Sequence, residues 1–348
     1  MKFLVFFAVG ILLLWLAFRK VDTTKFISDL REANYYWLLL SVLFGFFAFV
    51  SRSRRWVLLI HPLGYNPSLR NSFYALMTGY LANLALPRLG EITRCVALGK
   101  KEKIPVDQLI GTVVVERTID FFSLMTIMII LIFTSGDEVG PFLKNSIQVP
   151  IQKMFGATWI IWFAFVLFLF AAVTLFLVIR YKNSLRKFRF FSKMFDVGRG
   201  VINGLKTITS MQKKWEFVFH TIFIWLNYAL MTYVVFFSLE STSFLTFRDS
   251  IFILVIGGLG MSAPVSGGIG AFHYIIQQGL YHVKGIPLED GFAYATLTHE
   301  SQLIFVVITG AISFFILFRK DKVSVPPVIQ PLKPPNDFLP PIPQNGGL

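Results

Sequence analysis

The chain has 348 residues, of which 55% are hydrophobic and only 15% charged, and its mean hydropathy is +0.65. A soluble domain of this size carries about 25% charged residues, so the composition excludes an ordinary soluble protein and predicts a polytopic membrane protein. The formal net charge of +14 would suggest nucleic acid as the partner of a soluble protein. Here the basic residues flank apolar segments, so we expect anionic lipid headgroups and no nucleic acid.

Six apolar segments are long enough to cross a bilayer, which takes roughly 20 residues with a range of about 17–25. The first could be mistaken for a signal peptide, but it lacks a small-residue cleavage site and runs into Arg19 and Lys20. We therefore expect it to remain as a span. The six predicted spans are 2–18, 35–51, 108–133, 157–179, 217–239 and 291–318.

Proline and glycine interrupt two further apolar stretches. Asn83 to Arg94 reads N-L-A-L-P-R-L-G-E-I-T-R, and Gly257 to His273 reads G-G-L-G-M-S-A-P-V-S-G-G-I-G-A-F-H. Proline removes a backbone donor and glycine loosens a helix, so neither stretch is expected to cross the bilayer as a plain helix. Paired interrupted segments in two halves of a chain indicate the binding site of a transporter.

The loop charges predict the orientation. Loop 180–214 has ten basic residues against one acidic residue, and the stretches 52–71 and 100–103 are also basic, whereas loop 134–156 is balanced and loop 240–249 has two acidic residues against one basic residue. We therefore place the basic segments and both termini on the cytoplasmic side of a bacterial inner membrane.

Six full crossings fit these charges only if the broken stretches are hairpins that enter from opposite sides. The predicted fold is all-α and polytopic, with six full spans plus two broken re-entrant helical hairpins in an inverted-topology repeat, 35–133 and 217–318. If each broken stretch instead crosses fully, the chain has eight spans. Residues 1–320 would form the transmembrane domain. The proline-rich residues 321–348 would form a disordered cytoplasmic tail that a partner could bind.

Ionisable residues gather in the first broken stretch and in the span after it. A charge at the bilayer centre costs about 2.5–3.5 kcal/mol, so these side chains are expected to face protein or water. In one interpretation an ion pair of Arg94 or Arg88 with Glu116 or Asp120 only fastens the hairpin to the span. In the other, the fastened hairpin presents Arg88 to an anion. The adjacent residues Glu116 and Arg117 are expected to point apart. The candidate binding residues here are Asn83, Arg88, Glu91, Arg94, Glu116, Arg117 and Asp120.

The glycines around Pro264 allow two interpretations. Backbone amides and a helix that begins near Gly268 would suit a phosphate, or the glycines form a tight turn that lets helices pack closely. His299 could titrate near neutrality or be simply hydrogen-bonded. The histidines lack metal-ligand spacing, and no P-loop or nucleophile elbow is present, so we expect no catalytic residue, metal or cofactor. The candidate binding residues here are Ser266, Gly267, Gly268, His273, His299 and Glu300.

At these residues the chain resembles the flippase-like family of lysylphosphatidylglycerol synthase transmembrane regions. The resemblance covers about residues 1–320 and implies movement of a lipid between leaflets, with roles for Arg88, Glu91, Arg94, Glu116, Arg117 and Asp120. A proline-rich tail stands in place of the aminoacyl-transferase domain, and His273 stands where many members have glutamate. The matching stretches are Asn83–Arg94, G-T-V-V-V-E-R-T-I-D at 111–120 and P-V-S-G-G-I-G at 264–270.

The sequence therefore predicts an integral membrane lipid translocase for an anionic phospholipid or a polyprenyl-phosphate-linked lipid. In this hypothesis Arg88, Arg94 and Arg117 attract the phosphate, while carboxylates balance charge or move protons. One alternative is an intramembrane transferase acting on a lipid-linked phosphate. The other is a non-transporting scaffold that binds through the tail and the basic loop. In each of these three hypotheses the protein could be a homo-oligomer.

Overall fold

The computed structural model describes residues 2–19, 21–143, 162, 169, 211–263 and 265–319. The chain divides into two units, Met1–Leu317 and Phe318–Leu348. The described part contains helices and no strand, so the all-helical prediction is confirmed. The predicted basic loop and the tail lie almost entirely outside the described residues, as does the predicted span 157–179.

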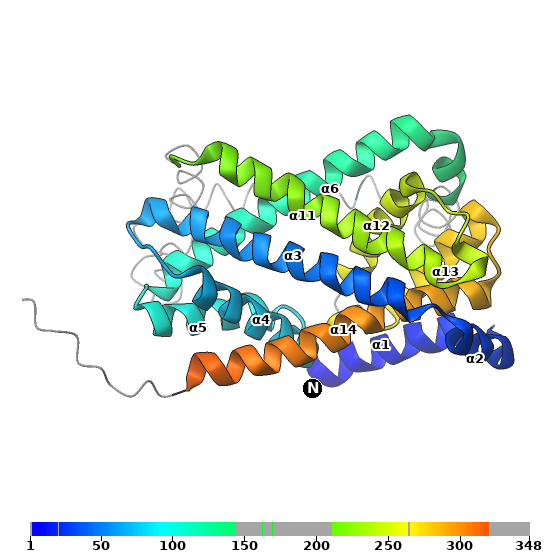
Figure 1. The fold of residues 1–348 in the computed structure, drawn as a ribbon, viewed down its shortest axis with the longest axis horizontal. Helices are drawn as coiled ribbons and strands as arrows, with labels where there is room; N and C mark the ends of the chain where they lie inside the picture. Colours follow the sequence, from blue (N-terminus) through cyan, green and yellow to red (C-terminus); the bar gives the residue numbers. More distant parts are fainter. Residues whose placement is uncertain are drawn as a thin grey trace, which may run out of the picture. The chain divides into compact units, whose positions relative to one another are not determined.

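Figure 1 follows the helices along the chain. Polar residues begin several of them: the side chains of Asp22, Asn34 and Ser68 accept hydrogen bonds from backbone amides of the first turn. The α-helices are α1 (Lys2–Phe18), α2 (Thr23–Glu32), α3 (Tyr35–Ile60), α4 (Leu69–Ala85), α5 (Leu89–Glu102), α6 (Val106–Leu143), α11 (Lys214–Val235), α12 (Phe247–Met261), α13 (Ala271–Lys284) and α14 (Leu288–Phe318).

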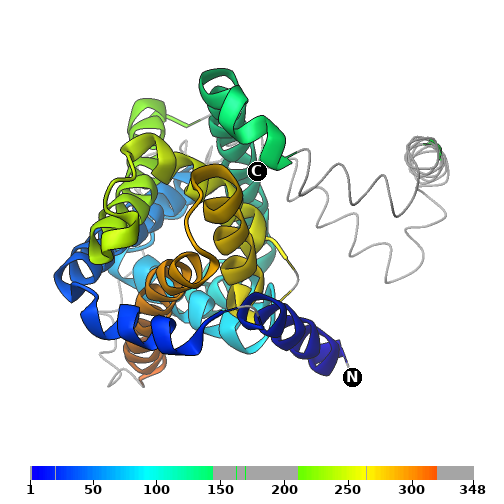
Figure 2. The ribbon, with the colours of Figure 1, turned by 90° about the vertical axis from the view of Figure 1, so that its right-hand side faces the viewer.

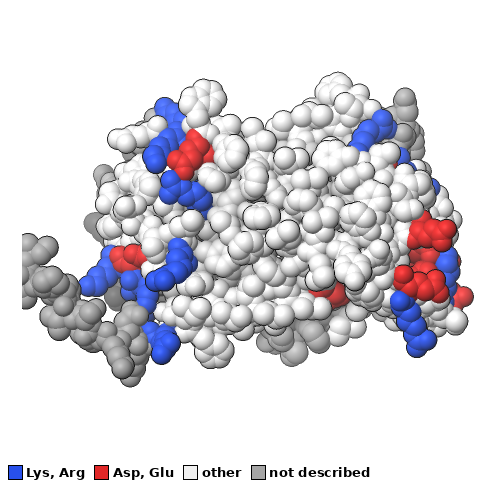
Figure 3. All heavy atoms as spheres, in the orientation of Figure 1, with Lys and Arg blue, Asp and Glu red and all other residues white. Residues whose placement is uncertain are grey.

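Four of the described helices are long and apolar enough to cross a membrane. They coincide with four predicted spans, and α1 is a 17-residue apolar helix at the position of the first. In the space-filling view most Lys, Arg, Asp and Glu side chains lie near the two ends of these helices, with a broad uncharged surface between them (Figure 3). The four spans are Tyr35–Leu63, Val106–Thr134, Lys214–Ser238 and Leu288–Phe318.

One predicted span boundary was wrong. The second span was expected to end at residue 51, but α3 continues to Ile60 and carries Arg52 and Arg55 inside it as buried residues. The helix continues because an apolar run, W-V-L-L-I, follows the arginines and packs into the protein interior. The third span was expected to end at residue 133, and the candidate span Val106–Thr134 confirms this boundary, although helix α6 itself continues to Leu143.

The first broken stretch is an antiparallel helical hairpin of α4 and α5. At its base the backbone amide of Ser68 donates to Glu102 Oε1 over 3.1 Å. Near its tip the backbone amide of Gly90 donates to Asn83 Oδ1 over 2.6 Å. Gly79 and Gly90 bring the two backbones together, since a Cβ on Gly79 would lie 2.7 Å from the Gly90 carbonyl oxygen. The proline at position 87 therefore ends one helix and the chain reverses direction.

The second broken stretch is also an antiparallel hairpin, formed by α12 and α13. An ion pair of 2.7 Å between Asp249 and Lys284 joins the first turn of α12 to the last turn of α13. Gly260 lies against α13, since a Cβ there would be 2.8 Å from Ile275 Cγ2. Pro264 lies outside the described residues. At the tip, Gly270 has a φ of 81° and its Cα faces the backbone of α1, which packs beside α13 (Figure 2).

The two halves of the described chain have the same order of elements, a long helix, a hairpin and a second long helix. The first long helices, α3 and α11, pack antiparallel: the amide of Asn34 donates to the Ser238 carbonyl over 2.9 Å, and Arg54 pairs with Glu216 at 2.6 Å. Leu317, near the end of α14, packs with the first turns of α6. The base of the second hairpin packs in a different hydrophobic cluster. The corresponding long helices, α3 with α11 and α6 with α14, therefore run in opposite directions.

The tips of the hairpins meet between the long helices. A Cβ on Gly267, in the second tip, would lie 3.0 Å from Leu84 Cδ2, in the last turn of α4. The bases of the hairpins belong to different hydrophobic clusters: Leu98 of α5 packs with Trp56, whereas Leu280 of α13 packs with Leu38. The bases therefore lie at opposite ends of α3.

Candidate functional site

A network of ion pairs surrounds Glu116 in the middle of the first half. The Glu116 side chain is 0% exposed and accepts hydrogen bonds from Arg52 Nε at 2.9 Å, Arg94 Nη2 at 3.0 Å and Arg117 Nη2 at 2.9 Å. These donors come from α3, α5 and α6. Glu116 lies ten residues after Val106, which is about 15 Å along the α6 axis. Three helices thus converge on one buried carboxylate.

Asp120 lies one turn further along α6 and shares the same arginines. It pairs with Arg52, with Arg55 Nη2 at 2.5 Å and with Arg117 Nη2 at 3.7 Å. Four arginines therefore meet two carboxylates in this network, which leaves a formal charge of +2. We refer to Arg52, Arg55, Arg94, Arg117, Glu116 and Asp120 as the arginine network.

The Arg94 guanidinium contacts the Trp56 ring as well as the Glu116 carboxylate. Its Cζ lies 4.7 Å from the centroid of the Trp56 ring, and the Trp56 indole donates to Thr112 Oγ1 over 2.9 Å. This stacking places a cation over the negative face of the ring. Two nitrogens of Arg94, Nε and Nη1, are buried without a hydrogen-bond partner among the described residues.

The structure corrects two sequence interpretations of this region. Arg52 and Arg55 were counted as cytoplasmic loop charges, yet both belong to the arginine network. Their spacing of three residues on one helical face was the signal that could have identified them. Glu116 and Arg117 were expected to point apart, but the Arg117 side chain is long enough to fold back and donate to Glu116.

A groove between α5 and α6 opens beside the network. It has a volume of about 470 Å³. The Arg117 side chain, at 41% exposure, is the most accessible arginine of the network. The Glu91 Oε2 atom is buried without a hydrogen-bond partner in the described part of the chain, as is Arg117 Nε. The groove is lined by Glu91, Ile92, Ile110, Val113, Val114, Arg117, Thr118, Phe121 and Phe122.

Arg88 lies at the hairpin tip and outside the network. Its backbone has a φ of 64° and a ψ of 3°, which is left-handed and unfavourable for a residue with a Cβ. The side chain is exposed and forms no ion pair with a described residue. Of the two arginines expected to pair with Glu116 or Asp120, Arg94 does so and Arg88 does not.

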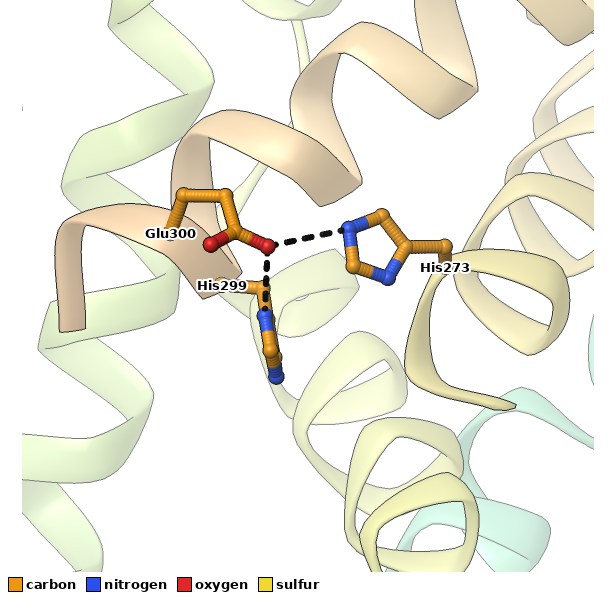
Figure 4. Close-up of side chains that lie close together, drawn as sticks. All are labelled: His273, His299 and Glu300. Atoms are coloured by element: carbon orange, nitrogen blue, oxygen red, sulfur yellow. Dashed lines mark hydrogen bonds and ion pairs between the residues drawn. The ribbon is translucent and has the colours of Figure 1, made fainter. Parts of the chain in front are cut away.

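A second polar cluster lies where the second hairpin tip meets α14 (Figure 4). Glu300 Oε1 is 3.0 Å from His299 Nδ1 and 3.6 Å from His273 Nε2. The His299 Nε2 atom is 2.8 Å from the Gly267 carbonyl oxygen. The histidines are 2% and 7% exposed. We call His273, His299 and Glu300 the histidine–glutamate trio.

The predicted glycine-motif residues lie at this cluster. Gly267 and Gly268 have φ values of 62° and 77°, which explains why glycine is needed in this turn. The Ser266 hydroxyl is buried without a hydrogen-bond partner among the described residues. The turn thus brings a backbone carbonyl to His299, 32 residues away in the chain.

The chain is similar to one known family and to two archaeal membrane proteins. A family described as "Lysylphosphatidylglycerol synthase TM region" matches residues 3–310. Two similar proteins of Methanocaldococcus jannaschii are the UPF0104 membrane proteins MJ1595 and MJ1078. The first is 32% identical over 31% of this chain and 34% of its own length, and the second is 23% identical over 69% of this chain and 95% of its own length. No solved structure matches.

Proposed function

Because this chain belongs to the family of lysylphosphatidylglycerol synthase transmembrane regions, we propose that it moves an anionic lipid between the leaflets of a membrane. The lipid is a phospholipid or a polyprenyl-phosphate-linked lipid. The membrane is the bacterial inner membrane, with both termini on the cytoplasmic side, because the ends richest in Lys and Arg are expected there.

The observation that carries the proposal is the excess positive charge of the arginine network. Four arginines contact two carboxylates, about 15 Å along α6 from its first residue. A charge at membrane depth costs about 2.5–3.5 kcal/mol even on insertion scales. An anion beside the network reduces that cost, and a lipid phosphate is an anion that a bilayer supplies.

The groove suits the two parts of such a lipid. Arg117 offers a guanidinium that can donate a charge-assisted hydrogen bond to phosphate, while Ile92, Val114 and Phe121 offer apolar walls to an acyl or prenyl chain. Phe121 is 57% exposed, so the groove is open to the hydrocarbon side. Glu91 shares the groove and, as a like charge, opposes phosphate when it is ionised.

The arrangement of the hairpins supports movement between leaflets. Their bases lie at opposite ends of α3, and their tips meet at Leu84 and Gly267. Alternating access in transporters depends on two such hairpins of opposite orientation around a central binding site. In this proposal each hairpin re-enters the membrane from its own side.

The test is a proteoliposome assay with headgroup-labelled lipids and a membrane-impermeant quencher. We expect labelled phosphatidylglycerol or polyprenyl phosphate to cross faster than labelled phosphatidylcholine. Arg117→Gln should slow the anionic lipid by about tenfold or more, because a hydrogen bond to a charged group contributes about 1.5–3 kcal/mol. Arg31→Gln, which removes an exposed charge on α2, is the matched control and should leave the rate unchanged. Crossing that does not depend on the headgroup contradicts the proposal.

One observation favours a second function, group transfer to or from a lipid-linked phosphate. The histidine–glutamate trio brings together side chains that can carry protons. Product formation in detergent, where there are no leaflets to cross, would support transfer and count against transport as the primary activity.

A further inference from the structure

Three ligand atoms of the histidine–glutamate trio face one another across a small space. One ligand atom of each of the three side chains lies within 4.8 Å of the other two, and Figure 4 shows the side chains converging. We propose that the trio binds a divalent transition-metal ion of the Zn²⁺ class. The site joins α13 to α14 beside the second hairpin tip.

The separations fit such an ion. Glu300 Oε1 is 3.0 Å from His299 Nδ1 and 3.6 Å from His273 Nε2. Zinc–nitrogen and zinc–oxygen bonds are about 2.0–2.2 Å long, so two ligand atoms of a tetrahedral site lie about 3.4 Å apart. The two observed separations lie on either side of this value. The ligand nitrogens of the two histidines lie within 4.8 Å of each other, so the imidazole rings must approach each other for all three atoms to reach bonding distance.

The tautomer of His299 points to a cation. The Gly267 carbonyl can only accept, so His299 Nε2 carries a proton and donates it over 2.8 Å. In the neutral imidazole this leaves a lone pair on Nδ1, which faces a carboxylate oxygen at 3.0 Å. Two acceptors at that distance repel unless a proton or a cation lies between them. A backbone carbonyl that fixes the second nitrogen is also the usual partner of a metal-bound histidine.

A metal ion satisfies more of the cluster than a proton does. One proton can bridge His299 and Glu300, but it leaves His273 Nε2 at 3.6 Å from the carboxylate without a hydrogen bond. A metal ion engages all three side chains. Its double charge also offsets the charge of the Glu300 carboxylate, and two histidines with one carboxylate is a set of ligands that zinc accepts.

The surroundings leave one coordination position open. Both histidines are buried, whereas the Glu300 side chain is 39% exposed, so the site opens on the Glu300 side. The rings of Phe272 and Phe292 flank the two histidines, with centroids 5.4 Å and 5.6 Å away. Three protein ligands leave a fourth position for water or an anionic oxygen.

The experiment is a Co²⁺ titration of tag-free protein in detergent after removal of metal with EDTA. Tetrahedral Co²⁺ bound to nitrogen and oxygen absorbs visible light, so binding is followed directly. We expect one Co²⁺ per chain, displaced by Zn²⁺, which binds more tightly. His273→Ala and Glu300→Gln should each weaken binding by about 100-fold or more, because loss of a mere outer-shell partner already costs about 10–100-fold.

The control is His282→Ala, which removes an exposed histidine from the last turn of α13 and should leave the Co²⁺ affinity unchanged. Glu300→Gln keeps the size of the side chain, and its thermal unfolding shows whether the variant is folded. If the wild-type protein binds no Co²⁺, a proton alone bridges the trio and the proposal is wrong. It is also wrong if both variants bind as the wild type does. Neither result depends on lipid transport.

Discussion

Replacing Glu116 with glutamine tests the arginine network directly. The substitution keeps the shape of the side chain and removes the charge that three guanidinium groups contact within 3.0 Å. The formal charge of the arginine network rises from +2 to +3, and the side chain at position 116 is fully buried. Removing one partner from a buried ion pair costs about 3–5 kcal/mol, because the other charge is left uncompensated. We therefore expect a loss of stability in that range.

The measurement is unfolding of the detergent-solubilised protein by SDS, followed by tryptophan fluorescence. Glu216→Gln is the matched control, since Glu216 also pairs with an arginine, Arg54, but both side chains are about 30% exposed. A pair of that kind contributes about 0–1 kcal/mol. If Glu116→Gln is no more destabilising than Glu216→Gln, the arginine network does not hold α3, α5 and α6 together, and the reasoning is refuted.

Two further predictions concern the hairpin backbone and the α2 segment. Gly90→Ala should destabilise the protein by about 1–3 kcal/mol, because the added Cβ meets a backbone carbonyl of α4. The control is Gly258→Ala, whose Cβ would lie 3.5 Å from a leucine side chain and which should be neutral. Equal unfolding midpoints for the two variants would contradict the prediction. Burial, followed by the hydrogen bond and charge of Asp290, raises the pKa of Asp29 from 3.8 to about 6. A raised pKa stabilises the folded state below the unfolded pKa, and this contribution is lost as pH rises through about 6. Asp29→Asn should therefore flatten the pH dependence of stability between pH 4 and 6, and an unchanged slope would contradict the assignment.

The histidine–glutamate trio and the arginine network differ in how visible they were in the sequence. Glu116, Arg117 and Asp120 are three ionisable residues within five positions of an apolar helix, so their burial against partners followed from the cost of a membrane charge. His273 lies 26 residues before His299, and a hairpin tip brings them together. No local spacing reveals such a pair, because the distance along the chain between two ligands does not fix their distance in space.

The sequence by itself determined the helical class, the membrane character, the family and the positions of the two breaks. These properties depend on local quantities: apolar length, proline and glycine in an apolar run, and short motifs. The tertiary structure alone decided the partners of the charges. Arg52 and Arg55 looked like loop cations until α3 was seen to continue to Ile60, and Arg88 looked like a network member until its side chain was seen to be exposed. The reason is that the crossing of α3, α5 and α6 decides which side chains meet, and a crossing involves residues far apart in the chain.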